Sequence, residues 1–255
     1  MTSSTRPHPY LRSGRADVLA HRGASHACPP GNTWAAFARA IEVGVDHIET
    51  DVQATRDGRV VVFHDERLDE LTTGSGRIGD HSWSELESLR YVADGDPTDD
   101  GLVLLDDLLS THPETYFNID IKTDETVEPA IRILRSHSVH DRVCIAAFGW
   151  RRLRRLRREL GPHWCSAYSR MEIVAARTAA WLRLPVPRFG DVVQAPREQK
   201  SATVIDRRFV DACHRRGIHV HVWTVNERDE VRRLRDLGVD ALITDRPDAV
   251  LDVLG

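Results

Sequence analysis

The sequence predicts a fold of the α/β class, a single (β/α)8 barrel, and three observations support this prediction. Short apolar segments rich in Val and Ile alternate with segments of helical periodicity along almost the whole chain, which is typical of a parallel sheet covered by helices. Several apolar segments lack polar alternation, as strands buried on both faces do. The length of 255 residues is common for one such barrel.

Nine segments are predicted as strands, one more than the barrel needs. They cover residues 18–21, 47–52, 60–64, 116–121, 143–148, 164–168, 191–194, 218–224 and 241–244. Only seven residues separate the second segment from the third, too few for a crossover helix. We therefore expect a hairpin or a helix-less return there, which would distort the barrel between these two strands.

Helices are predicted between the strands from periodicity and from end signals. Asn32 is expected to cap the first helix and Gly44 to close it, as these residue types commonly do. One predicted helix is rich in arginine, but its leucines recur at helical spacing, so the arginines are interpreted as a solvated face. The arginine-rich helix covers residues 150–160. The other helices predicted after the first cover residues 83–89, 129–136, 171–184, 207–216 and 227–237.

The remaining organisation follows from composition. Residues 1–17 are predicted to be a flexible polar lead without a signal peptide, followed by one domain over residues 18–255. Residues 65–112 form a long, turn-rich connection, expected on the active-site side. The four cysteines lack metal-ligand spacing, which favours free thiols and a cytoplasmic location. A net charge of -4 and the lack of a long apolar segment argue against nucleic-acid binding and stable membrane insertion.

Ionisable side chains lie at the ends of four consecutive predicted strands. Glu49 and Asp51 are two residues apart in one strand and so share a face, as do Asp120 and Lys122 in another. Because the carboxyl ends of barrel strands meet at one mouth, we expect all these groups to converge. The set comprises His21, Arg22, Glu49, Asp51, His64, Asp120 and Lys122.

This combination of groups indicates a metal-assisted reaction at a phosphoryl group. Three carboxylates in one site repel one another, and a hard divalent cation such as Mg²⁺ or Ca²⁺ removes that repulsion. The chain lacks the Cys and paired His spacings of zinc sites. An arginine and a lysine beside the cation fit a phosphoryl anion. Two flanking imidazoles then indicate one general base and one general acid.

Each residue also has a purely structural interpretation. Glu49 and Asp51 could pair with arginines, and Asp120 could pair with Lys122. Taken together, the structural interpretations are less plausible than each is alone. They would require four consecutive strands to place ionisable groups at the same end without a functional reason. Lys122 is one of only two lysines among 35 basic residues, which fits a need for a compact charge at that position. His219 and His221 share a strand face and are interpreted as residues of the barrel wall.

Seven motifs together resemble the glycerophosphodiester phosphodiesterase family. They are AHRG, NT at the start of a helix, IETDVQATRDGRVVVFHD, TTGSGRI, NIDIK, VWTVN and ITDRP, in the family's order over about residues 18–250. The resemblance implies a phospholipase C-like TIM barrel. It also implies hydrolysis of glycerophosphodiesters to glycerol 3-phosphate and an alcohol, with Mg²⁺ or Ca²⁺.

Position by position, the resemblance implies a role for each residue of the set. The implied acid–base pair is His21 and His64. The implied phosphate contacts are Arg22 and Lys122, the implied metal ligands are Glu49, Asp51 and Asp120, and the implied residues of the pocket wall are Trp223 and Gln194.

Two positions depart from the family's pattern. Asp120 occupies a position that is commonly Glu, and its shorter side chain implies a bridging water or a shifted metal ion. Relatives usually have P-E-N-T before the first helix, whereas this chain has Gly31 in place of the Glu. The missing carboxylate is expected to weaken metal binding or to change the fit of the substrate.

Three functions remain open at this stage, all with a small-molecule ligand. The first is hydrolysis of glycerophosphodiesters. The second is a lysophospholipase D-like activity on lysolipids, favoured by an apolar groove lined by residues 65–112. The third is a non-catalytic barrel that binds phosphodiesters, prompted by Gly31. The sequence leaves undecided the metal, the alcohol, the oligomeric state, which histidine is the base, and whether water or the glycerol hydroxyl attacks.

Overall fold

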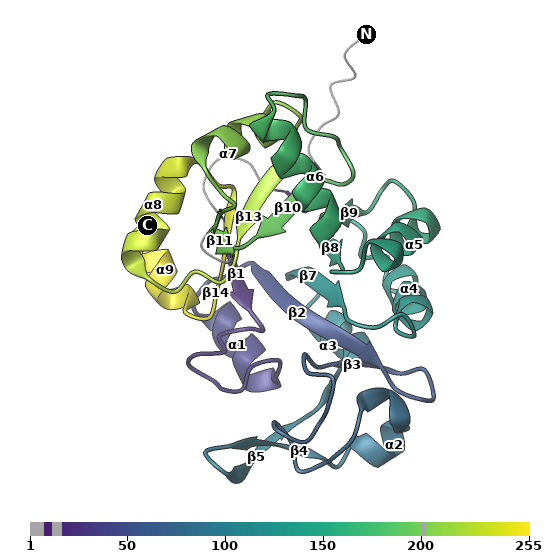
Figure 1. Ribbon diagram of the computed structural model, residues 1–255. Helices are drawn as coiled ribbons and strands as arrows, with labels where there is room; N and C mark the ends of the chain where they lie inside the picture. Colours follow the sequence, from purple (N-terminus) through teal and green to yellow (C-terminus); the bar gives the residue numbers. More distant parts are fainter. Residues whose placement is uncertain (1–7, 12–16, 200–201) are drawn as a thin grey trace.

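The structure is a computed structural model that describes residues 8–11, 17–199 and 202–255, and its core is a barrel of eight parallel strands within a ring of helices (Figure 1). A parallel bridge between Ala167 and Val192 joins the two ends of the strand row. The predicted (β/α)8 barrel is therefore confirmed. Neighbouring strands follow the order β10 (Val192–Ala195), β13 (His219–Val222), β14 (Ala241–Thr244), β1 (Asp17–His21), β2 (His47–Ala54), β7 (Tyr116–Ile121), β8 (Val143–Ala146) and β9 (Cys165–Ser166).

Each predicted strand segment contains a strand, and the extra one lies outside the barrel. This strand, β3 (Val60–Val62), runs antiparallel to β2, with Val62 opposite Val52. The expected hairpin between these two strands is therefore confirmed. A further short strand, β6 (Val103–Leu104), pairs with β3 and widens the sheet beside β2.

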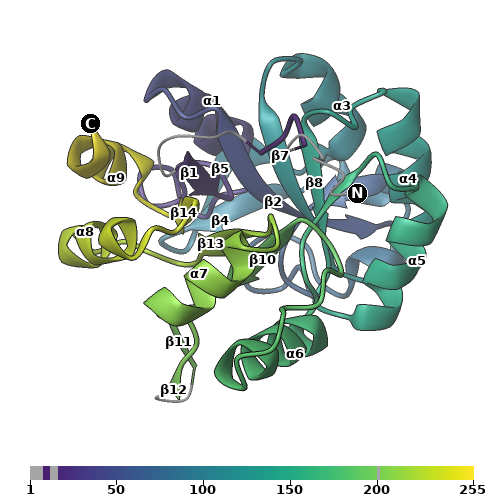
Figure 2. The same cartoon turned by 90° about the horizontal axis from the view of Figure 1, so that it is seen from above.

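Helices surround the barrel, as the view from above shows (Figure 2). Two of them, α3 and α9, lie where no helix is predicted. Among the described residues, no helix is long and apolar enough to cross a membrane. The helices are α1 (Trp34–Glu42), α3 (Leu105–Thr111), α4 (Val127–Ser136), α5 (Trp150–Leu160), α6 (Arg170–Trp181), α7 (Arg207–His214), α8 (Arg228–Leu237) and α9 (Pro247–Leu254).

Residues 65–104 form an excursion with a small core of its own, at the bottom of Figure 1. Phe63 and Tyr91 stack within this core, with ring centroids 6.0 Å apart. One helix here is shorter than the predicted 83–89. The elements are η1 (Ile78–Asp80), α2 (Trp83–Leu86) and the antiparallel strands β4 (Arg90–Ala93) and β5 (Asp96–Gly101); a second antiparallel pair, β11 (Glu198–Gln199) and β12 (Ala202–Thr203), follows β10.

The start of α1 corrects one prediction. Thr33, and not Asn32, caps this helix, because its Oγ1 accepts a hydrogen bond from the backbone N–H of Ala36 at 3.1 Å. Asn32 instead has a φ of 56°, in the left-handed region, and its side chain faces the barrel. At the other end, Gly44 follows the helix with a φ of 90°, as predicted.

Apolar side chains fill the space between strands and helices, and a smaller set fills the barrel interior. Tyr10 belongs to the interior set: it is 1% exposed and meets the His47 ring edge-on at 5.1 Å. Of the predicted flexible lead, Tyr10 and Leu11 are therefore packed against the barrel. Residues 1–7 and 12–16 of that lead lie outside the described residues.

Candidate active site

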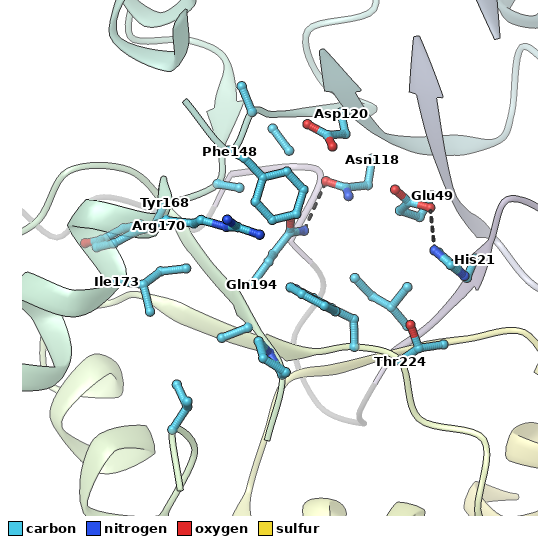
Figure 3. A pocket seen from close by; sticks show the side chains of 18 of the residues that line it. His21, Glu49, Asn118, Asp120, Phe148, Tyr168, Arg170, Ile173, Gln194 and Thr224 are labelled. Atoms are coloured by element: carbon cyan, nitrogen blue, oxygen red, sulfur yellow. Dashed lines mark hydrogen bonds and ion pairs between the residues drawn. The ribbon is translucent and has the colours of Figure 1, made fainter. Parts of the chain in front are cut away.

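A cavity of about 540 Å³ opens at the carboxyl ends of the barrel strands (Figure 3). Every site residue predicted from the sequence lines it, whereas residues 65–112 contribute none of its lining. This convergence is the arrangement expected of groups at the carboxyl ends of barrel strands. The predicted residues in the lining are His21, Arg22, Glu49, Asp51, His64, Asp120, Lys122, Gln194 and Trp223.

Strand β2 supplies two of the carboxylates, because alternate residues of a strand share a face. Glu49 and Asp51 both face the cavity, and Asp120 lies opposite Asp51 on β7. All three residues are buried. Buried carboxylates at neighbouring positions are costly unless positive charge balances them.

Lys122 balances two of these acids. Its Nζ lies 2.6 Å from Asp51 Oδ1 and 2.8 Å from Asp120 Oδ2. Burial raises the pKa of Asp51, but Lys122 and Arg22 outweigh burial and lower that pKa below its usual value. Burial likewise lowers the pKa of Lys122, but the two carboxylates outweigh it and raise that pKa. The Lys122–Asp51 pair is therefore ionised.

Glu49 has no comparable partner. Its Oε2 is buried and has no hydrogen bond within the described part of the chain, and His21 Nε2 lies 3.8 Å away. Burial and the charge of Asp51 raise the pKa of Glu49 to about 7. The positive charge of His21 and of Lys122 lowers that pKa but does not outweigh burial and Asp51.

The chemistry of these groups fits a hard divalent cation. Glu49 Oε2 and Asp120 Oδ1 are buried oxygens without a hydrogen-bond partner among residues 8–11, 17–199 and 202–255, and carboxylate oxygens are the ligands that Mg²⁺ and Ca²⁺ prefer. In the present arrangement, no three His, Cys, Asp or Glu side chains of the described residues form a ready ion-binding group. Lys122 Nζ lies between Asp51 and Asp120 instead. The predicted metal ligands thus share one cavity, and their role as ligands stays a prediction.

His21 is held by a carboxylate that sequence reasoning missed. Its Nδ1 lies 2.6 Å from Asp245 Oδ1, and Asp245 also accepts hydrogen bonds from Ser25 Oγ and Asn226 Nδ2. Burial lowers the pKa of His21, but the hydrogen bond to Asp245 and the charge of Glu49 outweigh it and raise that pKa. Because Nδ1 is engaged, Nε2 is the nitrogen left for a ligand in the cavity.

His64 has the same arrangement on another loop. Its Nδ1 lies 2.5 Å from Asp65 Oδ1, so Nε2 is again the free ring nitrogen. Gln53 Nε2 donates hydrogen bonds to the backbone oxygens of Phe63 and Asp65 and so holds this segment against β2. Both predicted acid–base residues therefore present the same ring nitrogen to one cavity.

The loop between β1 and α1 fixes Arg22 and Asn32. Both have φ values in the left-handed region, 55° and 56°, which is uncommon outside glycine and is concentrated at functional sites. Their backbones are joined by a 2.8 Å hydrogen bond from Asn32 N–H to Arg22 O. The Asn32 side chain accepts from Thr50 Oγ1 and donates to Asp51 Oδ2 at 3.3 Å. Asn32 thus positions Asp51, a role that sequence reasoning missed.

Asn118 and Phe148 also line the cavity and were missed from the sequence, and each contacts a lining residue that was predicted. Gln194 Nε2 donates to Asn118 Oδ1 at 3.0 Å, across the cavity floor in Figure 3. The Trp223 ring meets the Phe148 ring edge-on at 6.2 Å. Asn118 could have been found, because it shares a strand face with Asp120. Phe148 gave no comparable signal, since it follows its strand as an ordinary apolar residue.

The sequence matches the model of the glycerophosphoryl diester phosphodiesterase family over residues 21–249. The chain belongs to this family. A probable glycerophosphodiester phosphodiesterase 2 of Mycobacterium tuberculosis is 36% identical to it over 253 residues, which cover 96% of this chain and 93% of that protein. The predicted family and the prediction of a phosphodiester-hydrolysing enzyme are confirmed.

Solved structures show the same fold at lower sequence identity. A putative glycerophosphoryl diester phosphodiesterase from Silicibacter pomeroyi has a TM-score of 0.79 at 21% identity, with 97% of this chain and 95% of that chain covered. A phosphodiesterase from Oleispira antarctica, solved in complex with its product sn-glycerol-3-phosphate, has a TM-score of 0.75 at 22% identity, with 96% and 97% covered. These similarities support the barrel architecture.

Proposed function

We propose that this protein hydrolyses glycerophosphodiesters to glycerol 3-phosphate and an alcohol, with His21 and His64 as the acid–base pair and a divalent cation as cofactor. The observation that carries the proposal is the meeting of two carboxylate-held imidazoles, two cations and three carboxylates in one cavity. The family assignment supports the same reaction class.

Each group of the chain has a defined task in this proposal. Arg22 and Lys122 bind the phosphoryl oxygens of the substrate. One imidazole accepts the proton of the attacking hydroxyl as the new P–O bond forms, and the other gives a proton to the alcohol oxygen as its P–O bond breaks. Asp245 and Asp65 orient the two rings through their Nδ1 atoms. The attacking hydroxyl belongs to water or to the neighbouring glycerol carbon; release of a cyclic phosphate would identify the second route.

The proposed residues for the cation are Glu49, Asp51 and Asp120. When bound, a divalent cation supplies positive charge that stabilises the negative charge growing on the phosphoryl oxygens. Lys122 would then exchange part of its contact with the two aspartates for contact with the substrate. The preferred ion, Mg²⁺ or Ca²⁺, is distinguished by adding each ion back to metal-free protein.

Hydrolysis of glycerophosphoglycerol by the purified protein tests the proposal directly. We expect release of glycerol 3-phosphate that stops with EDTA and returns with Mg²⁺ or Ca²⁺. His21→Ala and His64→Ala should each lower kcat by about 10²–10⁴-fold, the usual contribution of a general acid or base. His163→Ala, an exposed histidine outside the cavity lining, is the matched control and should retain activity. Full activity of His21→Ala would refute the acid–base assignment.

A lysophospholipase D-like activity is the second candidate, and helix α6 favours it. Ile173 and Val174 of this helix line the cavity, and Met171 and Trp181 are both 66% exposed on the same helix. Apolar side chains of α6, and none of residues 65–112, therefore line the cavity. Release of choline from lysophosphatidylcholine measures this activity, and a rate well below that on glycerophosphoglycerol would exclude it as the main function.

We also propose a cytoplasmic location. It is supported by the four free cysteines, of which Cys144 and Cys165 are neighbours on adjacent strands without a disulfide between them. A small-molecule substrate remains the proposed partner.

A further inference from the structure

The cavity has two chemically different ends. Both histidines and all three lining carboxylates belong to the end near β1, β2 and β7. The other end is lined by apolar side chains at the end of β8, after β9 and on α6, together with two arginines, Arg170 and Arg177 (Figure 3 shows Arg170 beside Phe148). No acidic residue lines this second end. A substrate that fills the cavity therefore meets positive charge beyond the phosphate.

Of the two arginines, only Arg170 is free to bind a ligand. Arg177 Nη2 lies 2.6 Å from Asp206 Oδ2, so its charge is balanced within the protein. Arg170 forms no ion pair with a carboxylate of the described residues, and its Cζ lies 4.7 Å from the centre of the Phe148 ring. The aromatic contact fixes the direction of the guanidinium and leaves its N–H donors available.

The position of Arg170 has no benefit for the helix that carries it. It is the first residue of α6, where the helix dipole disfavours positive charge. The helix start is already secured by a capping box between Ser169 and Glu172. The charge of Arg170 is therefore not needed to start the helix, and its side chain lines the cavity.

The same geometry disfavours a cationic ligand at this end. Phe148 has two cations near its ring, since Lys122 Nζ also lies 5.6 Å from the ring centre. A quaternary ammonium group would normally bind such a ring through a cation–π contact. Here it would share the ring with Lys122, whose charge Asp51 and Asp120 balance, and with Arg170, whose charge no carboxylate of the described residues balances. An acyl chain alone would bury the Arg170 guanidinium without an acceptor, which is also costly.

We propose that Arg170 binds a second anionic group, a carboxylate or phosphate on the alcohol that is esterified to glycerol phosphate. The preferred substrates are then glycerophosphodiesters whose alcohol carries such an anionic group, in preference to those of choline or ethanolamine. This inference rests on the proposed function and names its substrate class. Arg170 is a specificity-determining residue that contacts the substrate away from the reacting phosphorus.

Four substrates measured side by side test the proposal: glycerophosphoinositol 4-phosphate, glycerophosphoserine, neutral glycerophosphoglycerol and glycerophosphocholine. For the wild-type holoenzyme we expect kcat/KM to be at least about 10-fold higher for one of the two substrates whose alcohol carries an anionic group, the phosphate of inositol 4-phosphate or the carboxylate of serine, than for glycerophosphocholine. Arg170→Ala should lower kcat/KM for that substrate by about 10- to 100-fold, the range of a charge-assisted hydrogen bond. The same substitution should change kcat/KM for glycerophosphoglycerol by less than about threefold, and mainly through KM.

Matched variants separate binding from structure. Arg170→Lys should restore part of the preference, and Arg170→Glu should shift it toward choline. Arg183→Ala, an exposed arginine just beyond the same helix and outside the cavity lining, should leave all four values unchanged. An equal loss on all four substrates in Arg170→Ala would overturn the proposal, as would a wild-type preference for glycerophosphocholine or for lysophosphatidylcholine.

A binding measurement keeps this inference separate from the proposed reaction. Calorimetric titration of His21→Ala and His21→Ala/Arg170→Ala with glycerophosphoinositol 4-phosphate and with glycerophosphoserine reports affinity without turnover. We expect the Arg170 substitution to weaken the tighter of the two by about 10-fold or more. If the wild type hydrolyses none of the four substrates, the proposed function fails, and the titration alone decides the role of Arg170; equal affinities would then refute it.

Discussion

At the residue scale, Glu49 is a carboxyl group of the cavity whose negative charge the folded protein accommodates poorly. Its folded pKa of about 7 is above the usual value of 4.5, because burial and Asp51 penalise the ionised form. The folding stability linked to this group is fully present below pH 4.5 and is lost as the pH rises through about 7. Above that pH, the ionised Glu49 destabilises the metal-free protein by about 3 kcal/mol.

We therefore predict that Glu49→Gln stabilises the metal-free protein at high pH. In urea denaturation with EDTA, this variant should exceed the wild type by about 2–3 kcal/mol at pH 8 and match it at pH 4.5. Added Mg²⁺ or Ca²⁺ should raise the stability of the wild type more than that of Glu49→Gln, because the cation stabilises the ionised carboxylate. Glu70→Gln, at an exposed position outside the cavity, is the control. A variant less stable than the wild type at pH 8 would contradict this account.

The sequence predicted the residues proposed to react, but it did not predict the residues that orient them through hydrogen bonds, such as Asp245. His21, Glu49 and Asp51 stand at strand ends, where residue type and strand alternation suffice to find them. Asp245, which holds His21, lies 224 positions away in the sequence. Local pattern carries no information on such a contact, because only closure of the barrel brings β14 beside β1.

At the element scale, the loop before α1 explains why this chain has Gly31 where the family pattern has a glutamate. Its φ of 82° is in the left-handed region, and a Cβ at this position would lie 2.8 Å from the Cβ of Ser25. The loop backbone of this chain therefore does not accommodate the glutamate that the family pattern has. Ser25 donates a hydrogen bond to Asp245, which holds His21. A displacement of Ser25 would therefore also disturb the position of His21.

We predict that Gly31→Glu lowers both stability and activity instead of restoring a missing ligand. The left-handed backbone costs a non-glycine residue about 1–2 kcal/mol, and the contact with Ser25 adds to that. Gly44→Glu is the matched control, since Gly44 has a φ of 90° but a Cβ there would meet nothing within 4 Å. Thermal unfolding should place Gly31→Glu below Gly44→Glu, and only the former should lose activity. Higher activity or tighter metal binding in Gly31→Glu would refute the prediction.

Most elements were predictable because their periodicity is local. The extra strand β3 was recognised as a return beside β2 from the short connection alone. Helix α3 was missed because its start has no side-chain cap, Leu104 standing in that position. Its apolar residues face the neighbouring β3 and β6, and that contact stabilises a short helix which lacks end signals of its own.

At the scale of the whole molecule, Tyr10 closes the barrel interior at the end opposite the cavity. It packs against His47 and Tyr116, the first residues of β2 and β7, and against Cys144 and Cys165 inside the barrel. Its hydroxyl is buried and forms no hydrogen bond with any residue that the structure describes. The Tyr10 ring therefore stabilises the fold through apolar packing.

We predict that Tyr10→Ala lowers the free energy of unfolding by about 3 kcal/mol, the usual cost of removing a buried aromatic ring. Tyr10→Phe keeps the ring and removes only the unsatisfied hydroxyl, so it should be neutral or slightly stabilising. Chemical denaturation measures both variants. Equal losses in the two variants would show that the hydroxyl, and not the packing, stabilises this end of the barrel.

The sequence by itself determined the barrel, the order of its strands along the chain and the set of ionisable groups at their carboxyl ends. Strand alternation and helix periodicity are local, so neighbouring residues suffice to predict them. Only the tertiary structure decided which groups pair: Lys122 with Asp51 and Asp120, Asp245 with His21, and Arg170 with Phe148. The physical reason is that electrostatic and packing energies depend on distances in space, and closure of the barrel sets those distances between segments far apart in the chain.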